Sequence, residues 1–361
     1  MKKLLSVLFA AGMALNLAAC GGPNSSQASS AGSDASAPSS QQEPIVLKVS
    51  CQQPEAHANT QAMMRIKEKV EQETNGGLIL ELYPGAVLGD YTVTFEEVML
   101  GTIDMSFQSL EGKYDPRLEL TFLPYLFTNT EDRKRVCMPG SNTYTLFEQI
   151  LSDLDIQLLG VYGEGYVGVG ANVLDPDYAH PEVQKKPLIR CNAADSNRLS
   201  VEGLGYPFVT MTFADTYSAL QTGVADGTFG NTAESIYTNF RDVVKYFIRY
   251  KSIAENNEIL INKAKWESLP EEYQTILYDA CMEECEASYD RAEEIDAEYC
   301  EKLEAEGIQV VNLTDEEMEA VAQAVRQHAW PKMRESLTQE VIDTVCKDVG
   351  MEIDWSQFEG E

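Results

Sequence analysis

Arg190 is the side chain in this sequence best placed to bind an anion, because it lies near the end of a short predicted strand that begins at Pro187. A guanidinium presents parallel N–H donors that match the two oxygens of a carboxylate. In a site that excludes water, such a bidentate pair would fix the orientation of a bound acid. A salt bridge at the surface or between domains is the commoner role of an arginine, so the residue type alone leaves both roles open.

A glycine-rich stretch, residues 163–168, matches the G-x-G-x-x-G pattern of dinucleotide-binding proteins. In that motif the glycines must open a helix whose N-terminus meets the pyrophosphate. Residues 169–172 read Val-Gly-Ala-Asn and are followed by Asp175-Pro176, which predicts no amphipathic helix. We therefore interpret the glycines as a flexible crossover between domains, and we expect no bound cofactor.

Cysteines and histidines give little support for a metal site. Cys281 and Cys285 are four residues apart on a predicted helix, a spacing that a metal could use, but the whole sequence contains only three histidines. One of the eight cysteines, Cys20, is predicted to carry a lipid, and the remaining odd number cannot all pair within one chain. We expect buried apolar thiols and no bound metal.

The charge balance excludes several classes of partner. The chain has 58 acidic residues against 27 lysines and arginines, a formal net charge of −31. Sequence-independent binding to nucleic acid or to an anionic membrane surface requires a basic face, so neither is expected. Salt screens most of this field beyond about 8 Å, so a local arginine can still bind an anion. The negative charge also keeps a neutral or cationic ligand open.

The first residues predict export and a lipid anchor. Lys2 and Lys3 precede a short apolar stretch that ends in Leu17-Ala18-Ala19-Cys20, which resembles the lipobox of bacterial lipoproteins. We expect residues 1–19 to be a cleaved signal peptide and the thiol of Cys20 to carry the lipid; an ordinary signal site is the alternative. The serine-rich residues 20–44 predict a flexible tether. The protein would then lie in the periplasmic space, at the outer face of the cell membrane, held there only by its lipid.

The rest of the chain alternates predicted strands with predicted helices, a pattern typical of open α/β sheets. Its 361 residues predict two domains or three. Ser268 and Glu271 predict a capping box for one long helix that continues to Glu306. At about 1.5 Å per residue this helix would be roughly 55 Å long, enough to run along both domains. Thr314 and Glu317 predict the cap of a last amphipathic helix.

Three groups of residues, taken in order, carry a family resemblance. The first is Thr74–Leu78 followed by Leu82–Gly85 and Leu88-Gly89, the second is Gly101–Met105, and the third, the most specific, comprises Leu188–Arg190, Met211–Phe213 and Tyr217–Gly227. Their order and spacing over roughly residues 45–310 resemble the solute-binding proteins of tripartite ATP-independent periplasmic (TRAP) transporters, the DctP-like family. The long acidic helix is similar to the domain-spanning helix of that family.

This resemblance implies a two-lobed periplasmic-binding-protein-like α/β fold in which crossing strands join the lobes around a ligand cleft. Residues 45–162 and 255–293 would form lobe I, and residues 163–254 and 294–361 would form lobe II. The family binds carboxylates, such as dicarboxylates and sugar acids. The lobes would close over one small organic acid, and the monomer would deliver it to the integral membrane subunits of the transporter without catalysis.

The same resemblance implies the main ligand contacts. Arg190 would hold the ligand carboxylate, and Phe213 would be an aromatic side chain of the cleft. Core packing is the alternative for Phe213, because it forms a helical stripe with Tyr217 and Leu220. We expect Arg190→Ala to weaken binding by roughly 30- to several thousand-fold, since losing one partner of a buried charge pair costs about 2–5 kcal/mol.

At two positions the sequence departs from the family pattern. An asparagine that often touches ligand falls on Gly230 here, so Asn231 is the expected replacement. Many members place a second arginine where this chain has Val167, which weakens the case for a second anionic group on the ligand; Tyr166 is expected to line the cleft instead. The remaining expected contacts are Asn192, Gln108, Ser109 and Tyr91.

Two other functions remain open on the sequence. A sensor lipoprotein could use the same closing fold to signal to a membrane kinase, and neighbouring genes for transporter subunits would argue against it. A secreted enzyme is the weaker alternative, because the chain contains no G-x-S-x-G, H-E-x-x-H or P-loop motif.

Overall fold

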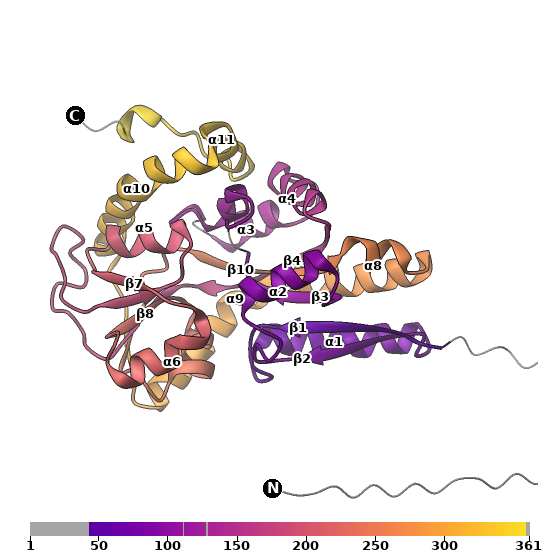
Figure 1. Ribbon diagram of the computed structural model, residues 1–361. Coiled ribbons are helices and arrows are strands. Elements are labelled where there is room, and N and C mark those ends of the chain that lie inside the picture. The colour runs from indigo at the N-terminus through magenta and orange to yellow at the C-terminus, as the bar shows by residue number, and fades with distance from the viewer. Residues whose placement is uncertain (1–42, 111, 128, 359–361) are drawn as a thin grey trace, which may run out of the picture. The chain divides into compact units, whose positions relative to one another are not determined.

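The computed structural model describes residues 43–110, 112–127 and 129–358 (Figure 1). The predicted signal peptide, Cys20 and the tether up to residue 42 lie outside the described residues. From Glu43 onward the chain forms one compact unit. Within the described part of the chain, no helix is both long and apolar enough to cross a membrane.

Two mixed β-sheets form the framework. Sheet A has the strand order β2-β1-β3-β10-β4; β1, β2 and β3 are parallel, and β10 is antiparallel to β3 and β4. Its central strands are mostly buried, as expected for a sheet that helices cover on both faces. Its strands are β1 (Ile45–Cys51), β2 (Leu78–Tyr83), β3 (Met105–Gln108), β4 (Ile156–Tyr166) and β10 (Ala254–Asn262).

Sheet B has the strand order β11-β9-β5-β8-β6-β7. In it β6 is parallel to β7 and β8, whereas β5 is antiparallel to β8 and β9. Its strands are β5 (Gly168–Ala171), β6 (Ile189–Cys191), β7 (Phe208–Thr210), β8 (Gly227–Asn231), β9 (Tyr246–Ile248) and β11 (Gln309–Val311).

Helices follow most of the strands, as the alternating sequence pattern predicts. Several begin at a side-chain cap that satisfies exposed N–H groups; Asp90, for example, accepts from the backbone N–H groups of Thr92 and Val93. The longer helices are α1 (Ala58–Glu73), α2 (Tyr91–Leu100), α3 (Thr130–Cys137), α4 (Asn142–Asp153), α5 (Asp195–Gly203), α6 (Phe213–Thr222), α8 (Lys263–Ser268), α9 (Glu271–Ala305), α10 (Asp315–Leu337) and α11 (Gln339–Asp348). Shorter turns are η1 (Pro116–Phe122), α7 (Ala233–Ser235), η2 (Ile236–Phe240) and η3 (Trp355–Phe358).

Two adjacent segments cross between the sheets. The chain leaves sheet A at the end of β4, passes through Val167 and enters sheet B as β5; it returns between β9 and β10. The backbone N–H of Val167 donates to the carbonyl of Ile253 at 2.9 Å, which joins the two crossings. The glycine-rich stretch is therefore a crossover, as predicted. Asp226-Gly227, at the end of the third motif, leads into β8 inside sheet B.

Close packing explains two glycines of β4, one of them in the crossover stretch, better than flexibility does. A Cβ on Gly163 would lie 2.5 Å from Cε1 of Tyr289, and one on Gly160 would lie 2.7 Å from Sγ of Cys285. Both partners belong to α9, so these glycines let α9 lie directly against β4.

The long helix α9 is confirmed, but its predicted cap is wrong. Its 35 residues contact β4 of sheet A and β11 of sheet B, so it runs past both sheets (Figure 1). The helix begins after Pro270, without a side-chain cap. Ser268 instead ends α8, where its hydroxyl donates to the carbonyl of Lys265 at 2.6 Å. Leu269-Pro270 separates α9 from α8, a short helix that the sequence analysis did not predict.

The C-terminal segment contains one helix more than predicted. Thr314 and Glu317 form the expected capping box of α10, but α11 follows it. α10 packs against α5 and η1, and α11 packs against α3 and α4, which belong to the predicted first lobe. The C-terminal segment thus contacts both predicted lobes, although residues 294–361 were expected in lobe II. The lobe boundaries themselves stay a prediction.

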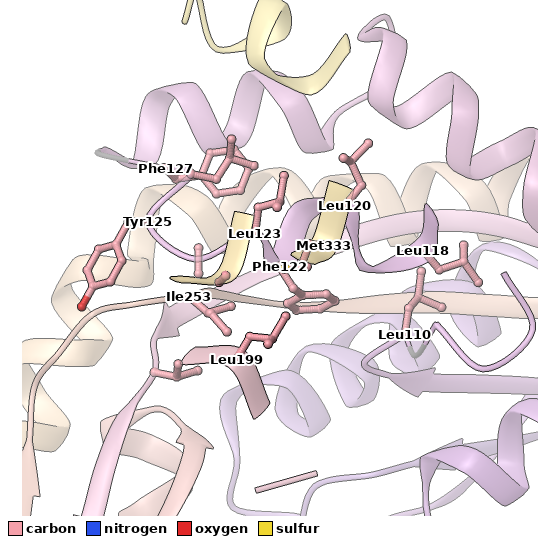
Figure 2. Close-up of a cluster of buried hydrophobic side chains, with 14 of the residues drawn as sticks. Leu110, Leu118, Leu120, Phe122, Leu123, Tyr125, Phe127, Leu199, Ile253 and Met333 are labelled. Carbon is pink, nitrogen blue, oxygen red and sulfur yellow. The ribbon is translucent and has the colours of Figure 1, made fainter. Parts of the chain in front are cut away.

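One buried apolar cluster joins segments that are far apart in the sequence. Figure 2 shows Phe122 and Leu123 of the η1 region in the same cluster as Leu199 of α5, Ile253 of the second crossing and Met333 of α10. The seven cysteines of the described residues are all buried and unpaired, as expected for apolar thiols.

Replacing Gly163 by alanine tests the close contact between β4 and α9. Because Tyr289 is 1% exposed, its ring has no room to move away, and overpacking of this kind costs about 1–3 kcal/mol. We expect Gly163→Ala to lower the free energy of unfolding by that amount in urea denaturation. Gly165→Ala is the matched control, since its Cβ would meet nothing closer than 3.4 Å. Equal losses in both variants would contradict the close-packing explanation.

Candidate functional site

Polar residues that follow strands of both sheets line one cavity. Sheet A contributes Gln52 and Gln53 after β1 and Ser109 after β3, and sheet B contributes Asn192 after β6 and Asn231 at the end of β8. The carboxyl ends of parallel strands are where open α/β sheets bind ligands. The empty volume of the cavity is about 680 Å³ with open solvent included.

The backbone of a neighbouring strand holds Arg190 in this cavity. Arg190 pairs with Val209 of β7 and Thr228 of β8 in the register of sheet B. Its Nε and Nη2 atoms both donate to the carbonyl oxygen of Met211, at 3.1 and 2.6 Å. The hydroxyl of Tyr91, the first residue of α2, also hydrogen-bonds the guanidinium. The side chain is thus oriented before any ligand binds.

Arg190 is a buried cation that lacks an acidic partner among the described residues. It is 3% exposed, and no carboxylate of the described residues forms an ion pair with it; Asp215 acts on it only as a more distant charge. Burial lowers its pKa, but a guanidinium stays charged at neutral pH. The Met211 carbonyl takes two of its five N–H donors, and the others are oriented to serve the Tyr91 hydroxyl and an anion. The site is therefore suited to a carboxylate.

Two glutamates line the same cavity. Glu164 of β4 accepts hydrogen bonds from the Nδ2 atoms of Asn59 and Asn257, at 2.9 and 2.8 Å. Glu255 of β10 accepts a hydrogen bond from the hydroxyl of Ser109. Burial raises the pKa of Glu164 well above its usual range and the pKa of Glu255 to about 7. Among the described residues that line the cavity, Arg190 is the only lysine or arginine.

Most of the contacts predicted from the sequence lie around this cavity. Phe213 is half-buried and lines the cavity. Its ring packs edge-on against the ring of Phe240, with 5.5 Å between the ring centroids. Tyr217 is exposed, so the predicted helical stripe is not a continuous core stripe. The residues that line the cavity are Arg190, Phe213, Asn231, Asn192, Ser109 and Tyr91. Their roles as ligand contacts stay a prediction.

Gln108 does not line the cavity, although it was predicted to contact the ligand. It is 1% exposed; its Nε2 donates to the carbonyl of Tyr91 at 2.8 Å, and its Oε1 accepts from the hydroxyl of Thr94. Successive side chains of a strand alternate between its faces. Because Ser109 faces the cavity, Gln108 points to the opposite face and fastens α2 to β3.

Tyr166 lines a different cavity from Arg190, and its predicted contact with the ligand stays a prediction. Its ring stands 6.0 Å from the Arg133 guanidinium. Glu164, two residues earlier on β4, lines both cavities.

That second cavity is larger, at about 1320 Å³ with open solvent included, but it is the weaker candidate. Two of its three basic residues are already engaged, Arg249 with the carboxylate of Asp296 and Arg326 with the carbonyl of Tyr125 at 2.6 Å, and the third, Lys251, is exposed. It also lies away from the carboxyl ends of the parallel strands, which line the Arg190 cavity.

Gly230 departs from the family pattern for a steric reason. Its φ of +89° favours glycine, and a Cβ there would lie 2.5 Å from Oδ1 of Asn197. Asn197 itself lines the cavity. Asn231, the expected replacement, is 2% exposed and donates from Nδ2 to the hydroxyl of Thr228 at 3.1 Å. An asparagine side chain therefore reaches the cavity from α5 as well as from β8.

Sequence reasoning missed several residues of the cavity. Gln52-Gln53 directly follows an apolar strand, a signal that was available. Glu164 is the only acidic residue of β4, and Glu255 begins the polar run of residues 255–258 in β10; both were also available signs of a special environment. Residues on helices gave no such signal, because the side of a helix that faces the cavity depends on how the helix packs. The missed polar residues are Gln52, Gln53, Glu164, Ser196, Asn197, Thr232, Ser235 and Glu255.

Comparisons with known proteins agree with this geometry. Bacterial extracellular solute-binding protein family 7, the DctP family, matches residues 49–336. The C4-dicarboxylate-binding periplasmic protein DctP of Vibrio cholerae serotype O1 is 25% identical over 316 residues, which cover 83% of this chain and 89% of that protein.

Solved structures share the fold. A TRAP periplasmic solute-binding protein from Desulfovibrio salexigens with bound orotic acid has a TM-score of 0.77 and 19% identity, covering 85% of this chain and 99% of its own. One from Shewanella oneidensis with bound succinate has a TM-score of 0.76 and 20% identity, with coverages of 85% and 99%.

The chain belongs to the DctP family of bacterial extracellular solute-binding proteins, the solute-binding proteins of TRAP transporters. The expected family and the expected two-sheet α/β fold are confirmed. Members of this family bind solutes and are not enzymes, so the expectation that the chain is no enzyme is confirmed as well.

Proposed function

We propose that this protein captures a small organic acid by its carboxylate and delivers it to the membrane subunits of a TRAP transporter. The observation that carries the proposal is Arg190, a buried cation that lines a cavity of both sheets and has no acidic partner among the described residues. Relatives of the same fold support the ligand class, since their structures hold succinate, L-gulonate and β-D-glucuronate, each of which bears a carboxylate.

Capture would be coupled to closure because the cavity draws on both sheets. A ligand held by Arg190 of sheet B would also meet Ser109, which follows a strand of sheet A. Such a ligand binds best when both sides are in place, so it shifts the protein toward the closed arrangement. The two crossing segments, at Val167 and at Ile253, would serve as the hinge between lobe I and lobe II. The closed monomer would then be the form that the membrane subunits accept.

Arg190→Ala tests the proposal directly. The chain from Gln41 onward, which contains the whole compact unit, is titrated with a panel of organic acids by calorimetry and thermal shift. A ligand at about 100 times its Kd should add about 2.7 kcal/mol of stability. We expect Arg190→Ala to weaken binding roughly 30- to 4000-fold, because loss of one partner of a buried charge pair costs about 2–5 kcal/mol.

Two further variants sharpen that experiment. Arg190→Lys keeps the charge but loses the planar pair of donors, so an intermediate affinity is expected. Lys251→Ala removes an exposed cation of the larger cavity and should leave binding unchanged. The proposal fails if no acid in a broad panel stabilises the wild-type protein, or if Arg190→Ala binds as tightly as wild type. Delivery is tested by uptake of the same acid; normal uptake in cells without the protein would favour a sensor.

We further propose that the mature protein is anchored by a lipid on Cys20. The lipobox-like residues Leu17-Ala18-Ala19-Cys20 support this, as does the serine-rich stretch between Cys20 and the first strand. Cys20→Ser removes the acceptor thiol, so the protein should move from the membrane fraction to the soluble fraction and lose incorporation of labelled fatty acid. Cys51→Ser, at a buried thiol, is the control that should keep both. Fatty-acid labelling that persists in Cys20→Ser would contradict the anchor.

A further inference from the structure

Glu255 is a carboxylate with unused hydrogen-bonding capacity in the same cavity as Arg190. It is half-buried near the start of β10 and lines the cavity. Its Oε1 accepts from the hydroxyl of Ser109, whereas its Oε2 has no hydrogen bond or ion pair to any described residue. A carboxylate offers about four acceptor positions, so this group can accept further donors from a ligand.

The neighbouring acids do not offer the same opportunity. Glu164 also lines the cavity, but its side chain is only 4% exposed and two asparagines already donate to its Oε1. Glu258 is fully buried and does not line the cavity. Among the described residues, Glu255 alone combines an accessible position in this cavity with an oxygen that has no partner.

We propose that the ligand is a zwitterion, a small acid whose carboxylate is held by Arg190 and whose ammonium group is bound by Glu255. This inference rests on the proposed function, because it names the ligand class of the same site. A carboxylate desolvated by a closing cavity is unfavourable unless a cation pairs with it. An ammonium group provides that charge together with N–H donors for the accessible oxygen.

The charges around the cavity disfavour the other ligand classes. Arg190 is the only lysine or arginine among the described residues that line it, and Val167 is buried and apolar. A second carboxylate on the ligand would therefore find no cation and would meet Glu255, a group of like charge. A zwitterion has no net charge, so the overall −31 of the chain does not repel it at long range.

Because Glu255 can be protonated, the proposal can also be tested in the wild-type protein, through the pH dependence of ligand affinity. The ionisable groups around it are Glu258 on its own strand, Glu164 of β4, Arg133 of α3, Arg190 of β6 and Tyr91 of α2. Burial raises the pKa of Glu255 to about 7. Below that pH the ammonium must displace a proton from Glu255. Affinity for a zwitterion should therefore fall as the pH is lowered from 8 to 5, relative to that of the matching hydroxy acid.

The test uses acids that differ only in the group paired with Glu255. One series is 4-aminobutyrate, 4-hydroxybutyrate and succinate; the second is the common L-amino acids with their 2-hydroxy analogues. Calorimetry at pH 8 on the chain from Gln41 onward gives the affinities. We expect at least one amino member to bind about 30-fold or more tightly than its hydroxy and carboxy analogues, the loss typical of an unpaired buried charge.

Glu255→Gln keeps the shape of the side chain and removes its charge. We expect it to abolish most of the amino preference while it leaves the affinity for the hydroxy acid within about 3-fold. Glu319→Gln, at an exposed acid of the larger cavity, is the matched control and should bind like wild type. If Glu255→Gln does not fold, the pH dependence of the amino-to-hydroxy affinity ratio in the wild-type protein decides instead.

The outcomes separate this inference from the function on which it rests. Binding of hydroxy acids or dicarboxylates through Arg190 with no amino acid preferred would overturn the zwitterion and leave carboxylate capture intact. An amino preference that Glu255→Gln does not reduce would overturn the role of Glu255. If no acid, with or without an amino group, binds the wild-type protein, both proposals are contradicted.

Discussion

A buried guanidinium that no acid of the described chain neutralises is the interaction around which this structure is organised. Taking a cation out of water is costly unless an anion or hydrogen bonds compensate. The carbonyl of Met211 and the hydroxyl of Tyr91 compensate Arg190 in part and fix its orientation. The remaining donors make affinity for a carboxylate a consequence of the fold, and they explain how a strongly acidic protein can bind an acid.

The architecture brings the groups that complete the site from two sheets. Polar contacts already join the segment after β1 to the segment after β8: the backbone N–H of Ala58 donates to Oε1 of Glu234 at 2.7 Å, and Nδ2 of Asn239 donates to Oε1 of Gln53 at 3.1 Å. The crossing strands and α9 connect the same two sheets through apolar packing. A ligand between the sheets therefore adds to contacts that hold them together, which is how binding would select a closed form for transport.

The sequence was a good guide wherever one local rule decides the structure, and a poor one where packing decides. Apolar runs located most strands and helices to within a few residues, and motif order identified the family. Ser268 misled because Leu269-Pro270 separates two helices. Gln108 and Ser109 are adjacent, yet only Ser109 faces the cavity. Which of the two side chains does so depends on the register of β3 in its sheet. Glu255 became significant only when β10 placed it in the same cavity as Arg190.

The central claim is that a ligand carboxylate occupies the remaining donors of Arg190. A crystal structure of the protein with its tightest-binding acid measures this directly. We predict both carboxylate oxygens within about 2.7–2.9 Å of guanidinium nitrogens, with residues of both sheets in contact with the ligand. A ligand seated away from position 190, with that guanidinium turned toward one of the protein's own acids or toward bulk solvent, would contradict the claim.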